Sequence, residues 1–192
     1  YKMPEFNYKP YFNAEPVILP ENPTIGLGEF LGYFVGDGCF SIDESGTGRL
    51  ILSFGDDEPE VKEYMHNLIL NLFGIKPSET KKENDNSTNS FYSRTTLVHW
   101  LKNINVDKES ALQARVPEIV FRAGRSFAEG FVRGLFTADG TITEDGYPSV
   151  FSISEKLIDE TQQLMLSLGI PTSKSVTIDR ESAYGNNPLY RL

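Results

Sequence analysis

Two stretches of this sequence repeat one another, GEFLGYFVGDG at residues 28–38 and GFVRGLFTADG at residues 130–140. The offset between them is constant, and each places a small residue at every fourth position before ending in Asp-Gly. The small residues are Gly28, Gly32 and Gly36 in the first stretch and Gly130, Gly134 and Ala138 in the second. Such a duplication predicts two copies of one structural unit.

The apolar residues between the small ones predict that each stretch is a helix. Positions four apart share one helix face, so the small residues form a flat stripe. A glycine inside a helix costs about 0.5–1 kcal/mol relative to alanine, so a contact elsewhere must offset that cost. Stripes of small residues allow two helix backbones to approach closely. We therefore expect the two helices to pack on each other about a pseudo-twofold axis.

That packing would bring Asp37 and Asp139 together, because each stands at the C-terminal end of its helix. A helix C-terminus disfavours negative charge, and two neighbouring carboxylates repel each other. A divalent cation such as Mg²⁺ would relieve both effects, since it prefers oxygen ligands. Paired metal–carboxylate sites cleave phosphodiesters. A single Asp-Gly after a helix is more often a plain turn, but the duplicated register favours the metal site.

The segments after the two stretches also match each other. Residues 39–54 and 141–153 each predict a hairpin, the first with a glycine-rich turn and the second with an Asp-Gly turn. Each hairpin leads into a segment with helical apolar spacing, marked by residues 61–72 and 157–168. A glycine ends each of these predicted helices, at Gly74 and Gly169.

The first unit then continues with strands near residues 76–82 and 90–94, separated by a polar loop at 83–89, and with a short helix at 95–103. The second unit has strands near 173–179 and 188–192 and no counterpart to that last helix. The pattern predicts an α+β fold of two αββαββ units.

We divide the chain into three parts. Residues 1–23 hold five prolines and predict an extended arm or linker. Residues 24–124 form the first unit, and residues 125–192 form the second, which is shorter at its C-terminal end. Ser126 and Glu129 predict a capping box at the start of the second striped helix.

Composition excludes several classes of protein. The net charge of −9 argues against indiscriminate nucleic-acid binding, although a locally basic groove remains compatible with it. One cysteine, Cys39, excludes a disulfide framework, and two histidines make a histidine metal centre unfavourable. No segment predicts a membrane span or a signal peptide. We expect an intracellular monomer, in the cytoplasm or nucleoid.

Residues 30–38 and 132–140 resemble the two motifs of the LAGLIDADG, or dodecapeptide, homing endonucleases. The resemblance is greatest to the endonuclease domains carried inside inteins, which also have a block similar to Val116-Pro117-Glu118. It implies that the two sheets form a saddle over DNA and that both strands of a long asymmetric site are cut. No splicing residues are visible, so we expect the endonuclease part alone.

The same resemblance implies roles for particular residues. Asp37 and Asp139, with the adjoining Gly36 and Ala138, would hold divalent metal such as Mg²⁺. The implied partners are double-stranded DNA and the splicing domain of a host intein in the same precursor. Candidate DNA contacts on the sheets are Arg49, Lys81, Lys82, Arg94 and Lys174, with ordinary solvated surface charge as the alternative for each.

One position departs from the intein pattern. The lysine that assists cleavage in that subgroup is replaced by Ala114, and the neighbouring Arg115 is the candidate catalytic substitute. Arginine stays protonated and does not shuttle protons as a tuned lysine does. Ala114 and the net acidity favour an alternative, in which the domain has lost cleavage and binds DNA or persists only as a structural remnant.

Overall fold

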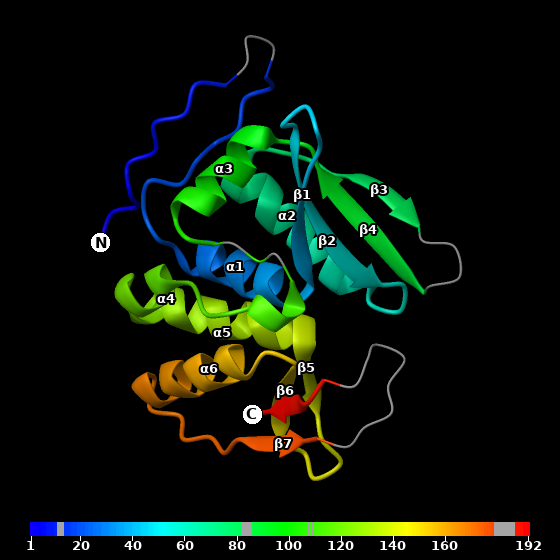
Figure 1. The fold of residues 1–192 in the computed structure, drawn as a ribbon, viewed down its shortest axis with the longest axis vertical. Coiled ribbons are helices and arrows are strands. Elements are labelled where there is room, and N and C mark those ends of the chain that lie inside the picture. The colour runs from blue at the N-terminus through cyan, green and yellow to red at the C-terminus, as the bar shows by residue number, and fades with distance from the viewer. Residues whose placement is uncertain (11–13, 82–85, 107, 109, 179–186) are drawn as a thin grey trace.

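A computed structural model describes residues 1–10, 14–81, 86–106, 108, 110–178 and 187–192. The chain forms two αββαββ units stacked through their first helices, which run side by side across the middle of the molecule (Figure 1). The first unit comprises α1 (Ile25–Asp37), β1 (Gly38–Ile42), β2 (Gly48–Gly55), α2 (Pro59–Phe73), β3 (Ser78–Lys81) and β4 (Ser87–Tyr92), followed by α3 (Thr95–Asn103). A 3₁₀ turn (Ala111–Gln113) and α4 (Glu118–Arg122) connect the units. The second unit comprises α5 (Arg125–Asp139), β5 (Gly140–Ile142), β6 (Pro148–Ser152), α6 (Glu155–Ser167), β7 (Ser175–Thr177) and β8 (Leu189–Arg191).

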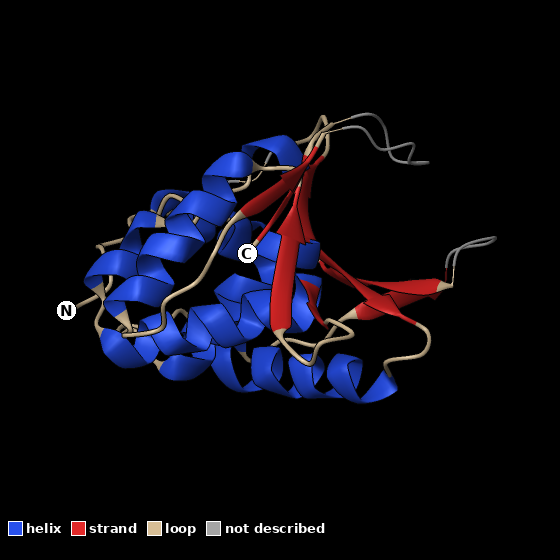
Figure 2. Ribbon diagram, turned by 90° about the horizontal axis from the view of Figure 1, so that it is seen from below, coloured by secondary structure: helices blue, strands red, loops and turns tan. Residues whose placement is uncertain are grey.

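Each unit has an antiparallel sheet with the same strand order, β1-β2-β4-β3 in the first and β5-β6-β8-β7 in the second. Helices lie on one side of the sheets, and the two sheets meet at an angle on the other side (Figure 2). The predicted α+β class and the repeat of the αββαββ unit are both confirmed.

The two striped helices pack backbone against backbone. A Cβ built on Gly32 of α1 would lie 2.0 Å from the carbonyl oxygen of Phe131, and one on Gly134 of α5 would lie 1.9 Å from that of Glu29. No real Cβ tolerates such distances, so these positions require glycine. The predicted packing of the two motif helices is confirmed, and the contact explains why helix-disfavouring residues recur there.

Local signals set most helix ends. Thr24 caps α1, with its Oγ1 accepting from the Leu27 amide at 3.1 Å. Gly74 ends α2 in the left-handed conformation, with φ 70°. The predicted capping box is wrong, because α5 begins at Arg125 after Gly124, and no side chain caps it. Glu129 instead pairs with Arg125 at 2.8 Å.

The predicted polar loop at residues 83–89 is too long at its C-terminal end. β4 begins at Ser87, although residues 87–89 are polar. Thr88 and Asn89 pair with both neighbouring strands, and their side chains bond Asp56 and Ser53 at 3.0 and 2.8 Å. Cross-strand pairing therefore overrides the weak strand preference of these residues.

The described part of the N-terminal arm is extended and lies against the first unit. Met3 is buried, and Phe6, Val17 and Leu19 pack against the core. The Ile18 amide donates to the carbonyl of Phe73 at 2.9 Å. Among the described helices, none combines the length and apolar character needed to cross a bilayer.

Candidate functional site

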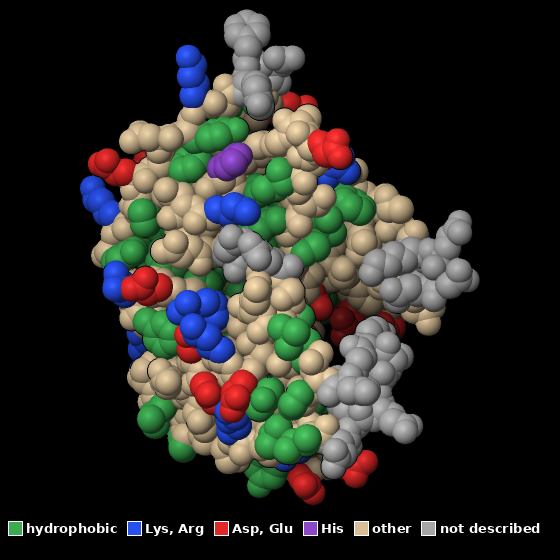
Figure 3. Space-filling model, in the orientation of Figure 1, with side chains coloured by type: hydrophobic (Ala, Val, Ile, Leu, Met, Phe, Trp, Pro, Cys, Tyr) green, Lys and Arg blue, Asp and Glu red, His purple; other side chains and the backbone are tan. Residues whose placement is uncertain are grey.

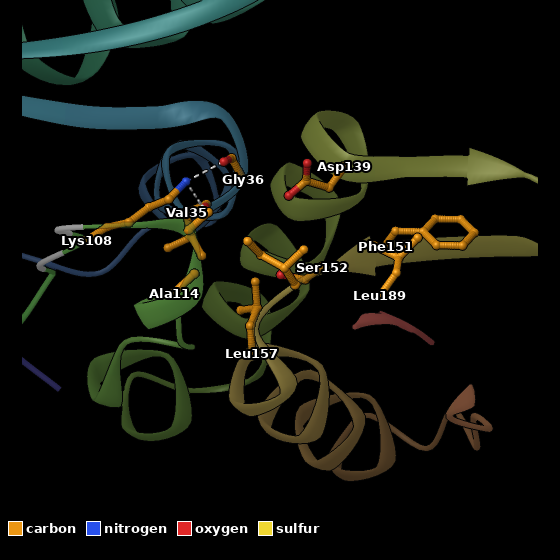
Figure 4. A pocket seen from close by; sticks show the side chains of 11 residues that line it. Val35, Gly36, Lys108, Ala114, Asp139, Phe151, Ser152, Leu157 and Leu189 are labelled. Carbon is orange, nitrogen blue, oxygen red and sulfur yellow. Dashed lines mark hydrogen bonds between the residues drawn. The ribbon is translucent and has the colours of Figure 1, made fainter. Parts of the chain in front are cut away.

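The C-terminal ends of α1 and α5 meet beside a pocket of about 220 Å³. A Cβ built on Gly36 would lie 2.4 Å from the Cβ of Ala138 and 3.1 Å from Oδ2 of Asp139. The striped contact thus continues to the last turn of both helices and ends at the acidic residues. The pocket wall also includes Lys108 and Ala114 (Figure 4).

Asp139 is a half-buried carboxylate at this pocket. Burial raises its pKa above the usual range, and the nearby ammonium of Lys108 opposes part of that rise. Asp37 ends α1 as Asp139 ends α5. Both carboxylates act electrostatically on Lys108, which places all three charged groups in one site.

Lys108 belongs to the segment that connects the two units. Its Nζ donates to the carbonyl oxygens of Val35 and Gly36 at 2.7 and 2.5 Å (Figure 4). These carbonyls stand in the last turn of α1, where helix acceptors lack helical partners. Burial lowers the pKa of Lys108, whereas Asp139 and Asp37 raise it. Nothing in the sequence pattern singled out Lys108, since no motif surrounds it.

Ala114 and Arg115 diverge at this point. Ala114 is buried and lines the pocket. Arg115 is not among the lining residues, and its Nη2 lies 3.2 Å from Oε1 of Glu160 on α6. The other oxygen of Glu160 accepts from the Val116 amide at 2.8 Å. The structure therefore brings Lys108, rather than Arg115, to the acidic residues.

The donor set fits a hard divalent cation. Asp37, Asp139 and the carbonyl of Gly36 offer oxygen ligands, which Mg²⁺ prefers, and Mg²⁺ commonly uses one or two protein carboxylates together with phosphate. In the described part of the chain, no three His, Cys, Asp or Glu side chains cluster as a complete metal cage. The site is thus of the kind that a phosphate ligand would complete.

The two faces of the first sheet differ in what covers them. On β2, Leu50, Leu52 and Phe54 are buried toward the helices, so Arg49 lies on the opposite, outward face. Ser41 pairs with Arg49 and is likewise exposed. The predicted DNA contact at Arg49 therefore stands on the uncovered face of the sheet.

The other predicted DNA contacts are arranged differently. Lys81 alternates in register with Glu79, which reaches Lys62 on α2, and its own Nζ lies 2.7 Å from Asp56. Arg94 precedes α3 and pairs with Glu15 of the arm. The structure does not bring these two side chains together with Arg49 on the outward face.

Lys174 lies on the helix side of the second sheet. Its Nζ is 2.8 Å from Glu155 and 2.5 Å from Asp159 of α6, and 5.1 Å from the ring centroid of Tyr190. Lys82 lies outside the described residues. A basic residue that sequence analysis missed is Arg191, which pairs with Phe151 on β6 and Ser175 on β7.

Charge on the face seen in Figure 3 is mixed, with Lys and Arg interspersed among Asp and Glu. Acidic side chains lie in the hollow between the two units on the right of that view. Phosphate contacts are made by clustered Lys and Arg, and this view shows no continuous basic tract. A cation held near the acidic residues would reduce the repulsion of a phosphate backbone.

Known proteins similar to this chain include much longer enzymes. It is 29% identical over 175 residues to a glutamine–fructose-6-phosphate aminotransferase of Methanocaldococcus jannaschii, covering 90% of this chain and 15% of that protein. It is 30% identical over 161 residues to a DNA polymerase of Thermococcus hydrothermalis, covering 81% of this chain and 9% of the polymerase. The chain thus spans a small fraction of these relatives.

Among solved structures, the chain resembles the homing endonuclease I-DmoI in complex with DNA and Ca, with a TM-score of 0.61 and 15% identity over 89% of this chain and 83% of that one. It also resembles full-length DUF199/WhiA from Thermatoga maritima, with a TM-score of 0.52 and 16% identity over 88% of this chain and 50% of that one. These likenesses show the fold.

The family match is broader than any single relative. Residues 26–105 and 126–192 match the LAGLIDADG-like domain. The matched segments contain α1 and α5 and both sheets, and they leave out the arm and most of the connecting segment. With the motif helices packed at the centre of two repeated units, the chain belongs to the LAGLIDADG-like domain family.

Proposed function

We propose that this chain is the homing endonuclease domain of an intein, which hydrolyses both strands of a specific DNA site with divalent metal held by Asp37 and Asp139. The observation that carries the proposal is the meeting of two helix C-termini, two carboxylates and Lys108 at one pocket. An arrangement that concentrates acidic residues and orphan carbonyls in one place is costly unless a cation and a phosphate complete it.

The residues have separate roles in this proposal. Asp37 and Asp139, with the Gly36 carbonyl and the backbone at Ala138, hold the metal. Bound Mg²⁺ would polarise the phosphate and lower the pKa of bound water. Lys108 is the positive group next to the scissile phosphate, a role that its lowered pKa supports. Arg115 has no role here, because its guanidinium is engaged by Glu160.

The outward faces of the two sheets are the proposed DNA surface. Their angle leaves a concave side free of helices (Figure 2). Arg49 on β2 contributes a positive charge on that side, and Arg191 on β8 is a second candidate from the other unit. Side chains on such strands read base edges, while phosphate contacts fix the register.

The intein setting rests on the relatives. The same region matches an aminotransferase and a DNA polymerase, whose activities have nothing in common, and it occupies 15% and 9% of their lengths. A module shared by unrelated enzymes behaves as an insertion rather than as part of either activity. A splicing domain in the same precursor is therefore a proposed partner.

Cleavage of the intein-free host-gene junction tests the proposal. Parent chain, Asp37→Asn and Asp139→Asn would each be incubated with that DNA and Mg²⁺, with EDTA as the metal-free arm. Double-strand cutting by the parent alone, and only with metal, is the expected result. Cutting that persists in both variants or in EDTA would overturn the assignment of the acidic residues.

A second candidate is a domain that binds DNA without cutting it. The observation that favours it is Lys108 Nζ at 2.5 Å from the Gly36 carbonyl, because the ammonium occupies an oxygen that a metal would use. Tight, salt-sensitive binding to the junction without cutting would support this candidate. Neither binding nor cutting would leave a structural remnant.

A further inference from the structure

The second unit carries an apolar groove away from the acidic pocket. Its volume is about 430 Å³, and its apolar wall consists of Phe136, Tyr147, Pro148, Met165, Ile170 and Leu192. The groove opens where the β5–β6 hairpin, the end of α6 and the end of β8 come together. None of these six residues lines the pocket at Asp139.

In the first unit, α3 covers the corresponding surface. It packs on β2 beside the β1–β2 hairpin (Figure 1). Thr95 Oγ1 accepts from the Gly48 amide at 2.9 Å where β2 begins, and the Trp100 ring lies 6.1 Å from the ring of Phe73 at the end of α2. The helix therefore joins the same three features that border the groove of the second unit.

Matched residues show the difference in cover. Ile75 and Ile170 each follow a glycine with positive φ just after α2 and α6. Ile75 is 2% exposed, whereas Ile170 is 46% exposed. Phe34 and Phe136 hold the same position of the repeat, and Phe34 is buried whereas Phe136 is half-buried. Tyr147, at the hairpin tip, is 70% exposed.

We propose that this groove is the receptor for a short amphipathic helix of the same kind as α3, supplied by the longer polypeptide in which the domain resides. The internal symmetry of the two units specifies the occupant, because an equivalent groove in the first unit is already filled by a helix. The relatives, of which this chain spans 15% and 9%, show that domains of this kind sit within much more polypeptide. The inference stands whether or not the chain cuts DNA.

The chemistry of the occupant can be inferred from α3. Its buried side chains are Leu97, Val98, Trp100 and Leu101, which occupy positions i, i+1, i+3 and i+4 of one helix face. The helix that binds the groove should present the same spacing of aliphatic and aromatic residues over about two to three turns. Burial of that face would remove the exposed apolar surface around Ile170 from water.

The test compares this chain with the longer form that carries the adjoining polypeptide of its parent protein. Ile170→Asp is introduced into both, and thermal unfolding and the fluorescence of an apolar dye are measured. We expect little change in the 192-residue chain, where Ile170 is already 46% exposed, and a Tm lower by about 4 °C or more in the longer form. The longer form should also bind less dye.

Two matched variants control the comparison. Leu166→Asp changes a 65% exposed residue of α6 that does not line the groove, and it should leave both forms unaffected. Ile75→Asp changes the buried counterpart, and it should destabilise both. Equal effects of Ile170→Asp on the two forms would overturn the proposal. So would a concentration-dependent dimer of the shorter chain that Ile170→Asp dissociates, because a second copy would then be the occupant.

Discussion

Glu29 of α1 receives two hydrogen bonds from Arg133 of α5, at 2.8 Å from Nε and 2.5 Å from Nη2. The carboxylate is only 4% exposed, and the Tyr64 hydroxyl of α2 also donates to it at 2.8 Å. This polar contact lies between glycine contacts of the same helix pair, so it fixes the register of one unit against the other.

Glu29→Gln should therefore weaken the junction of the units. Loss of the charge-assisted bonds should lower the free energy of unfolding by about 1.5–3 kcal/mol, as for hydrogen bonds to charged groups. Denaturant titration measures the change. Arg133→Met should cost less than its bonds suggest when combined with Glu29→Met, because the double variant leaves no unpaired buried charge. Strict additivity of the two single variants would contradict the pairing.

Gly134→Ala should destabilise the chain by overpacking. The added Cβ would meet the Glu29 carbonyl at 1.9 Å, and a backbone atom does not move aside as a side chain does. The loss should lie at the upper end of about 1–3 kcal/mol, measured by chemical unfolding. Gly26→Ala on α1 is the matched control, because its nearest neighbour is the flexible end of Leu68 at 3.0 Å, and it should be close to neutral.

Asp139→Asn should abolish cleavage and yet stabilise the metal-free fold. Burial raises the carboxyl pKa above 3.8, so the folded state disfavours the charged form. The cost is absent below the unfolded pKa, develops as pH rises through the folded pKa, and is complete at neutral pH. In EDTA the Tm of the variant should exceed that of the parent by about 2–4 °C at pH 7. The difference should shrink toward pH 4, and a variant less stable than the parent at pH 7 would contradict this account.

Lys108→Met should lower cleavage by about 10²–10⁴-fold, the usual contribution of a positioned acid–base group. It should also lower stability by about 1–3 kcal/mol, because the carbonyls of Val35 and Gly36 lose their donor. Single-turnover cleavage and unfolding measure the two effects. Lys62→Met, which removes a surface pair with Glu79 at 3.4 Å, is the control and should change neither by much. Unchanged cleavage in Lys108→Met would exclude the proposed role.

His66 should make stability depend on pH. It stands on α2 with Nε2 at 2.8 Å from Ser90 Oγ, and burial lowers its pKa below 6.5, with Glu79 opposing that effect. The fold therefore favours neutral imidazole, so stability is present above pH 6.5 and is lost as pH falls through the folded pKa. Unfolding measured from pH 7.5 to 5 should show this loss, and His66→Gln should flatten the slope.

Local sequence signals predicted the fold well. The repeated stripe, the hairpin turns and the glycine after each second helix depend on neighbours within a few residues, and all of them appear in the structure. The failures involve contacts from elsewhere in the chain. Ser126 cannot cap α5 because the helix starts one residue earlier, after Gly124. Residues 87–89 form strand because both neighbours pair with them.

The site could be predicted only in part. The pairing of the motif helices is implied by the stripes, so the sequence alone is enough to single out Asp37 and Asp139. It is not enough for Lys108, because the place of that side chain depends on the path of a connecting segment without a pattern. The side of the sheet occupied by Lys81 depends on register, which a one-residue shift reverses.

The backbone contact between α1 and α5 also divides the molecule by its tolerance of change. Because main-chain atoms meet at Gly32 and Gly134, the spacing of the two helix ends is a property of the peptide backbone and not of any adjustable side chain. The sheets attach to that pair from either side without setting its geometry. New DNA specificities can therefore arise strand by strand, in one half at a time, while the centre that would perform the chemistry stays the same.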